Sequence, residues 1–157
     1  MIDLHLHFDG SLPVKSVWEQ AKKQGIALNA ASVEELKKMM VCPVDCQSLN
    51  EYLEKFDLPL SVLQTKDGIR ECMEDLIAEL ISEGMIYAEI RFAPQLHLQK
   101  GRTQEEVVQA AIAGVEAATE GQEIKVQLIL CCMRGVDNDD ANRETVEMTS
   151  KYLGKGV

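Results

Sequence analysis

The segment IDLHLH, residues 2–7, places two of the three histidines of the chain only one residue apart. In a β-strand, residues two apart lie on the same face, roughly 6.5 Å from each other along the chain. The imidazoles of His5 and His7 can therefore converge on one divalent cation. Zinc suits imidazole nitrogen, and iron, nickel and cobalt are also tolerated. The spacing predicts a metal-binding pair, and the alternative is two surface histidines on a half-exposed edge strand.

Asp9 lies two residues beyond His7, just past the end of the predicted strand. Enzymes built on parallel barrels keep their chemistry at such strand ends. The carboxylate can orient a ligand, accept a substrate hydroxyl, or simply open an Asp-Gly turn with Gly10. A catalytic zinc needs three protein ligands and an open position. Two imidazoles alone are therefore an incomplete site.

Three apolar segments, residues 2–7, 85–92 and 124–132, are predicted as strands with amphipathic helices between them. The predicted helix boundaries are a start at Ser11, capping boxes Ser32-x-x-Glu35 and Ser48-x-x-Glu51, further starts at Thr65 and Thr103, and stops at Gly25, Gly84, Gly121 and Gly154. Strands that alternate with helices indicate a parallel sheet with crossover connections.

The fold class is therefore α/β, and two architectures fit the pattern equally well. One is a small doubly wound domain, and the other is the opening part of an eight-fold barrel, which takes roughly 250 residues. Residues 154–157 are predicted as a helix stop that leads into another strand. We expect residues 1–157 to be a single domain cut from a longer protein at the start of its fourth strand.

Composition narrows the partners of the chain. Its 157 residues include 16 basic and 26 acidic side chains, a net charge of -10, which argues against a nucleic-acid partner. We expect no membrane insertion, because no apolar run approaches the roughly 20 residues that a span needs. Five cysteines without regular spacing indicate free thiols in a reducing cytosol. Cys42 and Cys46 are interpreted as buried small hydrophobic residues rather than a metal clip.

The segment IDLHLHFDGSLP closely resembles the opening motif of the adenosine deaminase family, the metal-dependent purine deaminases. YAEIRFAPQLH is similar to the second strand of that family and its exit loop, and VQLILCCMR is similar to the third strand. The resemblance covers essentially the whole chain. It implies the N-terminal part of a (β/α)8 barrel, incomplete, with extra helices between strands 1 and 2.

The resemblance also implies roles for individual residues. His5 and His7 would be zinc ligands, and Asp9, with His7 close by, would bind the ribose 5′-hydroxyl of a purine nucleoside. An apolar lid would consist of Leu49, Tyr52, Leu53 and Phe56, whose alternative interpretation is an ordinary buried helix stripe. The acid–base residues of the family lie beyond its fourth strand, so no catalytic residue is assigned in this chain. His97 is interpreted as a loop residue.

The expected function of the intact enzyme is zinc-dependent hydrolysis of adenosine or deoxyadenosine to inosine or deoxyinosine, with the isolated chain inactive. Three alternatives are the adenine or AMP branch of the deaminases, a metal-dependent phosphoesterase of the histidinol-phosphatase type, and a non-catalytic binding module. An incomplete barrel leaves strand edges and one sheet face open to water, so we also expect self-association.

Overall fold

The computed structural model describes residues 1–157, the side chain of Val136 excepted, and contains one sheet of three parallel strands. The strands are β1 (Ile2–His7), β2 (Tyr87–Phe92) and β3 (Lys125–Leu130), in the order β1-β2-β3. The α-helices are α1 (Val14–Gln24), α2 (Val33–Met40), α3 (Leu49–Leu53), α4 (Asp57–Val62), α5 (Lys66–Ser82), α6 (Gln104–Thr119) and α7 (Asp139–Tyr152), and the 3₁₀ helices are η1 (Glu54–Phe56), η2 (Pro94–His97) and η3 (Val136–Asn138). The predicted α/β class, with extra helices between the first two strands, is confirmed.

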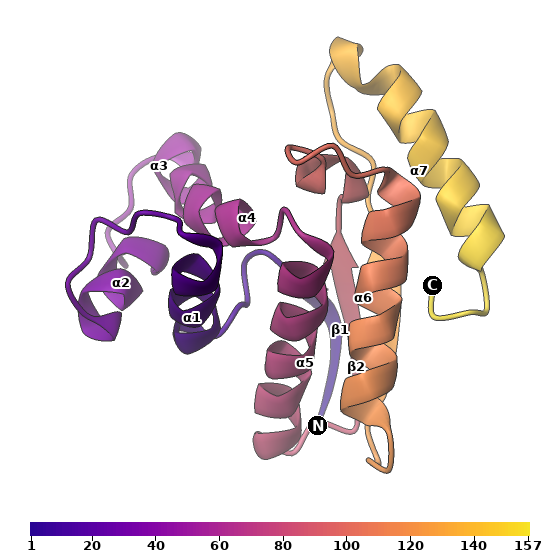
Figure 1. The fold of residues 1–157 in the computed structure, drawn as a ribbon, viewed down its shortest axis with the longest axis horizontal. Coiled ribbons are helices and arrows are strands. Elements are labelled where there is room, and N and C mark those ends of the chain that lie inside the picture. Colours follow the sequence, from indigo (N-terminus) through magenta and orange to yellow (C-terminus); the bar gives the residue numbers. More distant parts are fainter.

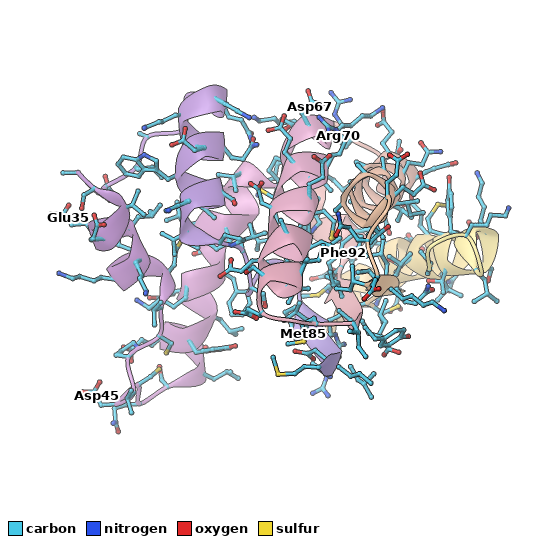
Figure 2. All side chains as sticks on the ribbon, turned by 90° about the horizontal axis from the view of Figure 1, so that it is seen from below. Glu35, Asp45, Asp67, Arg70, Met85 and Phe92 are labelled. Atoms are coloured by element: carbon cyan, nitrogen blue, oxygen red, sulfur yellow. The ribbon has the colours of Figure 1, made fainter. Side chains whose placement is uncertain are left out.

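The helices cover the sheet from one side. Figure 1 shows α5 and α6 side by side in front of the strands, with α1–α4 gathered in a lobe beside α5 and α7 flanking α6. Figure 2, seen from below, shows α5 on one side of the strands and Asp45, between α2 and α3, at the far edge of the lobe. Sequential parallel strands whose helices lie on one side are the arrangement of a partial barrel.

The hydrophobic core lies between the sheet and the helices α5 and α6. Along β2 the side chains alternate, so that Ala88, Ile90 and Phe92 are buried while the residues between them are half-buried. From β3, Val126 and Leu128 are buried in the same layer. The period of two therefore assigns one face of the sheet to the core and leaves the other for polar side chains.

Local hydrogen bonds fix the starts of the helices, and one predicted cap is wrong. Thr103 and Glu106 form a complete capping box at α6, with distances of 3.2 Å from the Glu106 N–H to Thr103 Oγ1 and 3.1 Å from the Thr103 N–H to Glu106 Oε2. Ser11 does not cap α1. The helix begins at Val14 directly after Pro13, whose fixed φ already suits the helix entry.

The close packing of α5 on α6 depends on Gly114. A Cβ atom at this position would lie 2.7 Å from the carbonyl oxygen of Arg70 and 2.8 Å from Cβ of Met73. The missing side chain therefore lets the two helix backbones approach each other. These helices in turn bury the covered face of the strands that carry the site.

The cysteines are free thiols, as predicted, but only Cys72 is buried. Cys42 and Cys46 are half-buried in the connection between α2 and α3, so their interpretation as buried hydrophobic residues is wrong. That connection lies outside the core, as the neighbouring Val44 demonstrates by its full exposure. Within the part of the chain that the structure describes, no helix combines the length and apolar character that a membrane crossing requires.

The segment after α7 lies along the edge of β3 that faces away from β2. The Leu128 N–H donates to the Gly156 carbonyl oxygen at 2.9 Å, and Val157 packs against the core. A fourth strand beginning at this point remains a prediction, as does the extent of the domain.

Candidate functional site

His5 and His7 lie together at the carboxyl end of β1. Their Nε2 atoms are 3.3 Å apart and their ring centroids 5.2 Å apart. Both side chains are exposed, on the face of the sheet that α5 and α6 leave open. The strand register shifts between Asp3 and Leu6, where the Asp3 carboxylate accepts the His5 N–H at 2.9 Å. The period of two and this irregularity together bring the two ring nitrogens to one point.

Arg91 on β2 is the neighbour of this pair, opposite His7 in the strand register. Its Nη1 lies 3.1 Å from His5 Nε2, and its Nε donates to Cys131 Sγ at 3.2 Å. Glu89, two residues before Arg91 on the same strand, accepts the Tyr87 hydroxyl at 2.9 Å. Arg91 is therefore a contact residue of the histidine pair.

Burial is the largest cause that lowers the pKa of His7 below its ordinary value of 6.5. The carboxylate of Asp9 acts in the opposite direction, and the charges of Arg91 and His5 lower the pKa further. His7 is therefore a neutral imidazole at pH 7, and a neutral imidazole keeps one nitrogen lone pair available to accept or to coordinate.

Asp9 is held at the exit of β1 by the residue before it. Phe8 is fully buried, its N–H donates to the Arg91 carbonyl oxygen at 2.9 Å, and its ring packs edge-on against Phe92 at 5.9 Å. One carboxylate oxygen of Asp9, Oδ1, is buried and has no hydrogen-bond partner among the described atoms. Burial raises the pKa of this carboxyl, and the nearby charge of His7 partly offsets that effect. An unpartnered acceptor here favours a ligand that donates a hydrogen bond.

A cavity of about 530 Å³ lies beside these residues, and His7, Asp9 and Arg91 line it. This volume falls in the range of small-molecule sites, roughly 300–1,000 Å³. One wall comes from the helical lobe and the other from the exit loops of β2 and β3. Phe56 packs against Gly10, where an added Cβ would lie 2.9 Å from the phenyl ring. The missing side chain at Gly10 thus allows the lobe to approach the end of β1.

The predicted lid set is only partly at the cavity. Tyr52, Leu53 and Phe56 line it, whereas Leu49 is 70% exposed. None of the four is buried, so the alternative of an ordinary buried helix stripe is wrong. These residues belong to the short helices α3 and η1, in which no residue is buried. Their role as a lid stays a prediction.

His97 lies in the exit segment of β2, as predicted, but it ends the short helix η2 there and is buried. Its Nδ1 lies 3.0 Å from the Leu63 carbonyl oxygen, so Nδ1 carries the proton of the neutral ring. Its ring packs edge-on against Phe92 at 5.8 Å. Burial lowers the pKa of His97 to about 4. The local sequence did not indicate this burial, because the Leu63 contact comes from a distant segment of the chain.

The sequence reading assigned no site role to the residues that follow β3. Cys131, Cys132 and Met133 line the cavity opposite the helical lobe. Their position in the sequence could have indicated a role in the site, because they directly follow the carboxyl end of a parallel strand, where sites form. Among the described residues, no group of three or more His, Cys, Asp and Glu side chains is arranged to hold a metal ion. The described chain therefore supplies a pair of possible metal donors and not a complete metal site.

Comparison with known proteins identifies the class of the chain. A sequence profile described as "Adenosine deaminase" matches residues 1–157. The chain is 49% identical over 156 residues to adenosine deaminase of Haemophilus ducreyi, covering 99% of this chain and 45% of that protein. It is 41% identical over 156 residues to adenosine deaminase of Clostridium perfringens, covering 99% of this chain and 47% of that one. It thus spans about half the length of these relatives.

Solved structures agree with the fold. Adenine deaminase from Arthrobacter aurescens has a TM-score of 0.77 at 24% identity, covering 98% of this chain and 45% of its own. Arabidopsis N6-mAMP deaminase has a TM-score of 0.78 at 21% identity, and the match covers 99% of this chain and 47% of that protein. An amidohydrolase from Burkholderia ambifaria, crystallised with bound zinc, has a TM-score of 0.78 at 15% identity, and the match covers 99% of this chain and 42% of that protein.

The fold is that of a partial α/β barrel, and the profile match gives its family. The chain belongs to the adenosine deaminase family, over its full described length. The predicted resemblance is thereby confirmed, and the phosphoesterase alternative is set aside.

Proposed function

We propose that the chain is the metal-binding and ribose-binding half of an enzyme that hydrolyses adenosine or deoxyadenosine to the inosine product and ammonia. The observation that carries the proposal is the convergence of the His5 and His7 ring nitrogens at the edge of a cavity of nucleoside size, which His7 and Asp9 line. The relatives at 41–49% identity are named for adenosine deamination, which supports this substrate above other purines.

The two imidazoles fit a zinc ion. Two nitrogens bound to one tetrahedral zinc at about 2.0–2.1 Å lie roughly 3.3–3.4 Å apart. The Nε2 atoms of His5 and His7 are separated by 3.3 Å. A zinc ion held here would supply the Lewis acidity that activates water for hydrolysis. Arg91 must release His5 Nε2 for this, because one lone pair cannot serve both partners.

The unpartnered Asp9 oxygen supports binding of a ribose 5′-hydroxyl, a hydrogen-bond donor that would satisfy it. His7 and Asp9 both line the cavity and are two residues apart in the chain, so the two side chains share one part of it. The purine would then lie between the helical lobe and the β3 exit loop. Aromatic and aliphatic side chains from the lobe, Tyr52, Leu53 and Phe56, would exclude water from it.

A second candidate is deamination of adenine or a nucleotide, which the structural neighbours favour. One is an adenine deaminase, and related Arabidopsis structures are complexes with GMP and IMP. Against a nucleotide stands Asp9, because a carboxylate at the proposed 5′-hydroxyl position repels a 5′-phosphate dianion. A substrate panel of adenosine, adenine and AMP separates these candidates.

The test is a chimera in which this chain replaces the matching 156 residues of the Haemophilus ducreyi protein. We expect the chimera to convert adenosine to inosine, followed by ultraviolet absorbance, and the isolated chain to be inactive because it holds two metal donors and no assigned acid–base residue. An inactive chimera that folds would contradict the proposal and favour a non-catalytic module. Turnover of adenosine by the isolated chain would contradict the prediction that the acid–base residues lie in the other half of the enzyme.

Substitutions in the chimera test the individual roles. Asp9→Asn keeps the shape of the side chain and removes its charge. It should raise KM for adenosine by roughly ten-fold and change KM for 5′-deoxyadenosine far less, since that analogue lacks the hydroxyl. Equal changes in KM for both substrates would contradict the proposed role of Asp9 in binding the ribose 5′-hydroxyl. Glu19→Gln, on the exposed face of α1, is the matched control.

Two further proposals concern the isolated chain. The side chains of Met1, Ile2 and Leu4 are each at least 60% exposed along β1, the edge strand, which supports self-association. A monomer in light scattering at all concentrations would contradict this.

Free cysteines at all five positions support a reducing compartment such as the cytosol, which fractionation of the source cells would test.

A further inference from the structure

Asn142, in the first turn of α7, holds both backbone groups of Met133. Its Oδ1 accepts the Met133 N–H at 2.8 Å, and its Nδ2 donates to the Met133 carbonyl oxygen at 2.8 Å. A side-chain amide has one acceptor and one donor in the same plane, so it pairs with a residue as a neighbouring strand would. Met133 is thus bound at two points although it lies beyond the last residue of β3.

The same amide reaches the exit of β2. Gln95 in η2 donates from Nε2 to Asn142 Oδ1 at 2.9 Å. Asn142 therefore ties the loop after β2 to the loop after β3. Ala93 and Leu96 from the first loop, and Met133 from the second, line the cavity. One side chain outside the cavity thereby connects two segments of its wall.

Asn142 is itself held in place by a buried amide. Gln104, the first residue of α6, is fully buried and donates from Nε2 to the Ala141 carbonyl oxygen at 2.8 Å. Its Oε1 accepts the hydroxyl of Thr145 at 2.7 Å, and Thr145 is buried as well. The residues on both sides of Asn142 along α7 are therefore fixed to α6, and the clamp projects from a rigid support.

We propose that Asn142 is a positioning residue that fixes the β3 exit loop as the wall opposite the helical lobe of the nucleoside cavity. The inference rests on the proposed function, because its consequence is measured with adenosine. Without the clamp, residues 131–133 sample more conformations, and ligand binding must order them. The loss falls on substrate binding, because Asn142 does not line the cavity and His5 and Asp9 are untouched.

The experiment compares Asn142→Ala, Asn142→Asp and the control Arg143→Ala in the chimera described above. Alanine favours helix more than asparagine does, so α7 is not weakened by the change itself. Asn142→Ala should raise KM for adenosine roughly ten-fold, the equivalent of one or two net hydrogen bonds, with kcat within about three-fold. Arg143→Ala removes the neighbouring side chain of α7, which makes no hydrogen bond to the cavity wall among the described residues, and should leave both constants unchanged.

Amide hydrogen exchange at Met133, measured in the chimera, gives a readout independent of turnover. Asn142→Ala should speed this exchange at least ten-fold, whereas Asn142→Asp keeps an acceptor for the N–H and should retain most of the protection. Unchanged exchange in Asn142→Ala overturns the clamp. Faster exchange with unchanged KM overturns the positioning role. If the chimera with native Asn142 is inactive, the proposed function fails, and the exchange result still decides whether the clamp exists.

Discussion

The substitution His97→Asn should remove one specific dependence of stability on pH. His97 is fully buried and neutral, with Nδ1–H bound to the Leu63 carbonyl oxygen and a pKa of about 4. Its pKa is about 6.5 in the unfolded chain. Between these values the unfolded state binds the extra proton, so stability falls as the pH is lowered through 6.5 and stops falling below 4. From pH 7.5 to pH 5 the loss is about 2 kcal/mol, and in full about 3 kcal/mol.

Asparagine can donate from Nδ2 to Leu63 much as the imidazole does, but it does not titrate. The variant should lose about 1–2 kcal/mol at pH 7.5, because its smaller side chain gives up the ring contact with Phe92. Its further loss on acidification should be about 2 kcal/mol smaller than that of the native chain. Urea unfolding followed by circular dichroism at both pH values measures this difference. All other ionisable groups are shared, so parallel pH curves for the two proteins would refute the reasoning.

Further predictions concern the helices behind the site. Gly114→Ala should destabilise the chain by about 2–3 kcal/mol in urea unfolding, since the new Cβ meets Met73 at 2.8 Å; a loss below about 0.5 kcal/mol would contradict the close packing. Thr103→Ala should cost about 1 kcal/mol by removing the capping box with Glu106, and an unchanged unfolding midpoint would argue against that box. Burial raises the pKa of Cys72 to about 12, so alkylation of this thiol at neutral pH should occur only on unfolding, and rapid labelling of the folded chain would contradict its burial.

The parts of the fold that follow from local chemistry were predictable. The spacing of two residues in β1 brings the rings of His5 and His7 together, and the capping box at Thr103 and Glu106 starts α6 as the sequence indicates. These features depend on residues within a few positions of each other. The apolar segments and turn signals also predicted three strands with helices between them. They did not distinguish a doubly wound domain from the first part of a barrel. The coverage of the sheet from one side separates them.

Features that depend on distant packing were not predictable. His97 looked like a loop residue, and it is buried because Leu63 and Phe92 come to it from other segments. Arg91 had no assignable partner until β1 and β3 were placed on either side of it. Asn142 is one polar residue on a polar helix, and only the fold brings it to Met133. The contacts of His97 with Leu63 and of Arg91 with His5 and Cys131 span many residues along the chain, and that of Asn142 with Met133 depends on the course of the loop between β3 and α7.

The zinc content of the chimera, measured by elemental analysis after dialysis, tests the central claim most directly. We predict close to one zinc per chain in the native-sequence chimera, and loss of that zinc in His5→Ala and in His7→Ala, because each removes one of two converging donors. His97→Asn, the matched control at the third histidine, should keep its zinc. Full zinc content in the His5→Ala and His7→Ala proteins would contradict the assignment of these imidazoles as the metal pair.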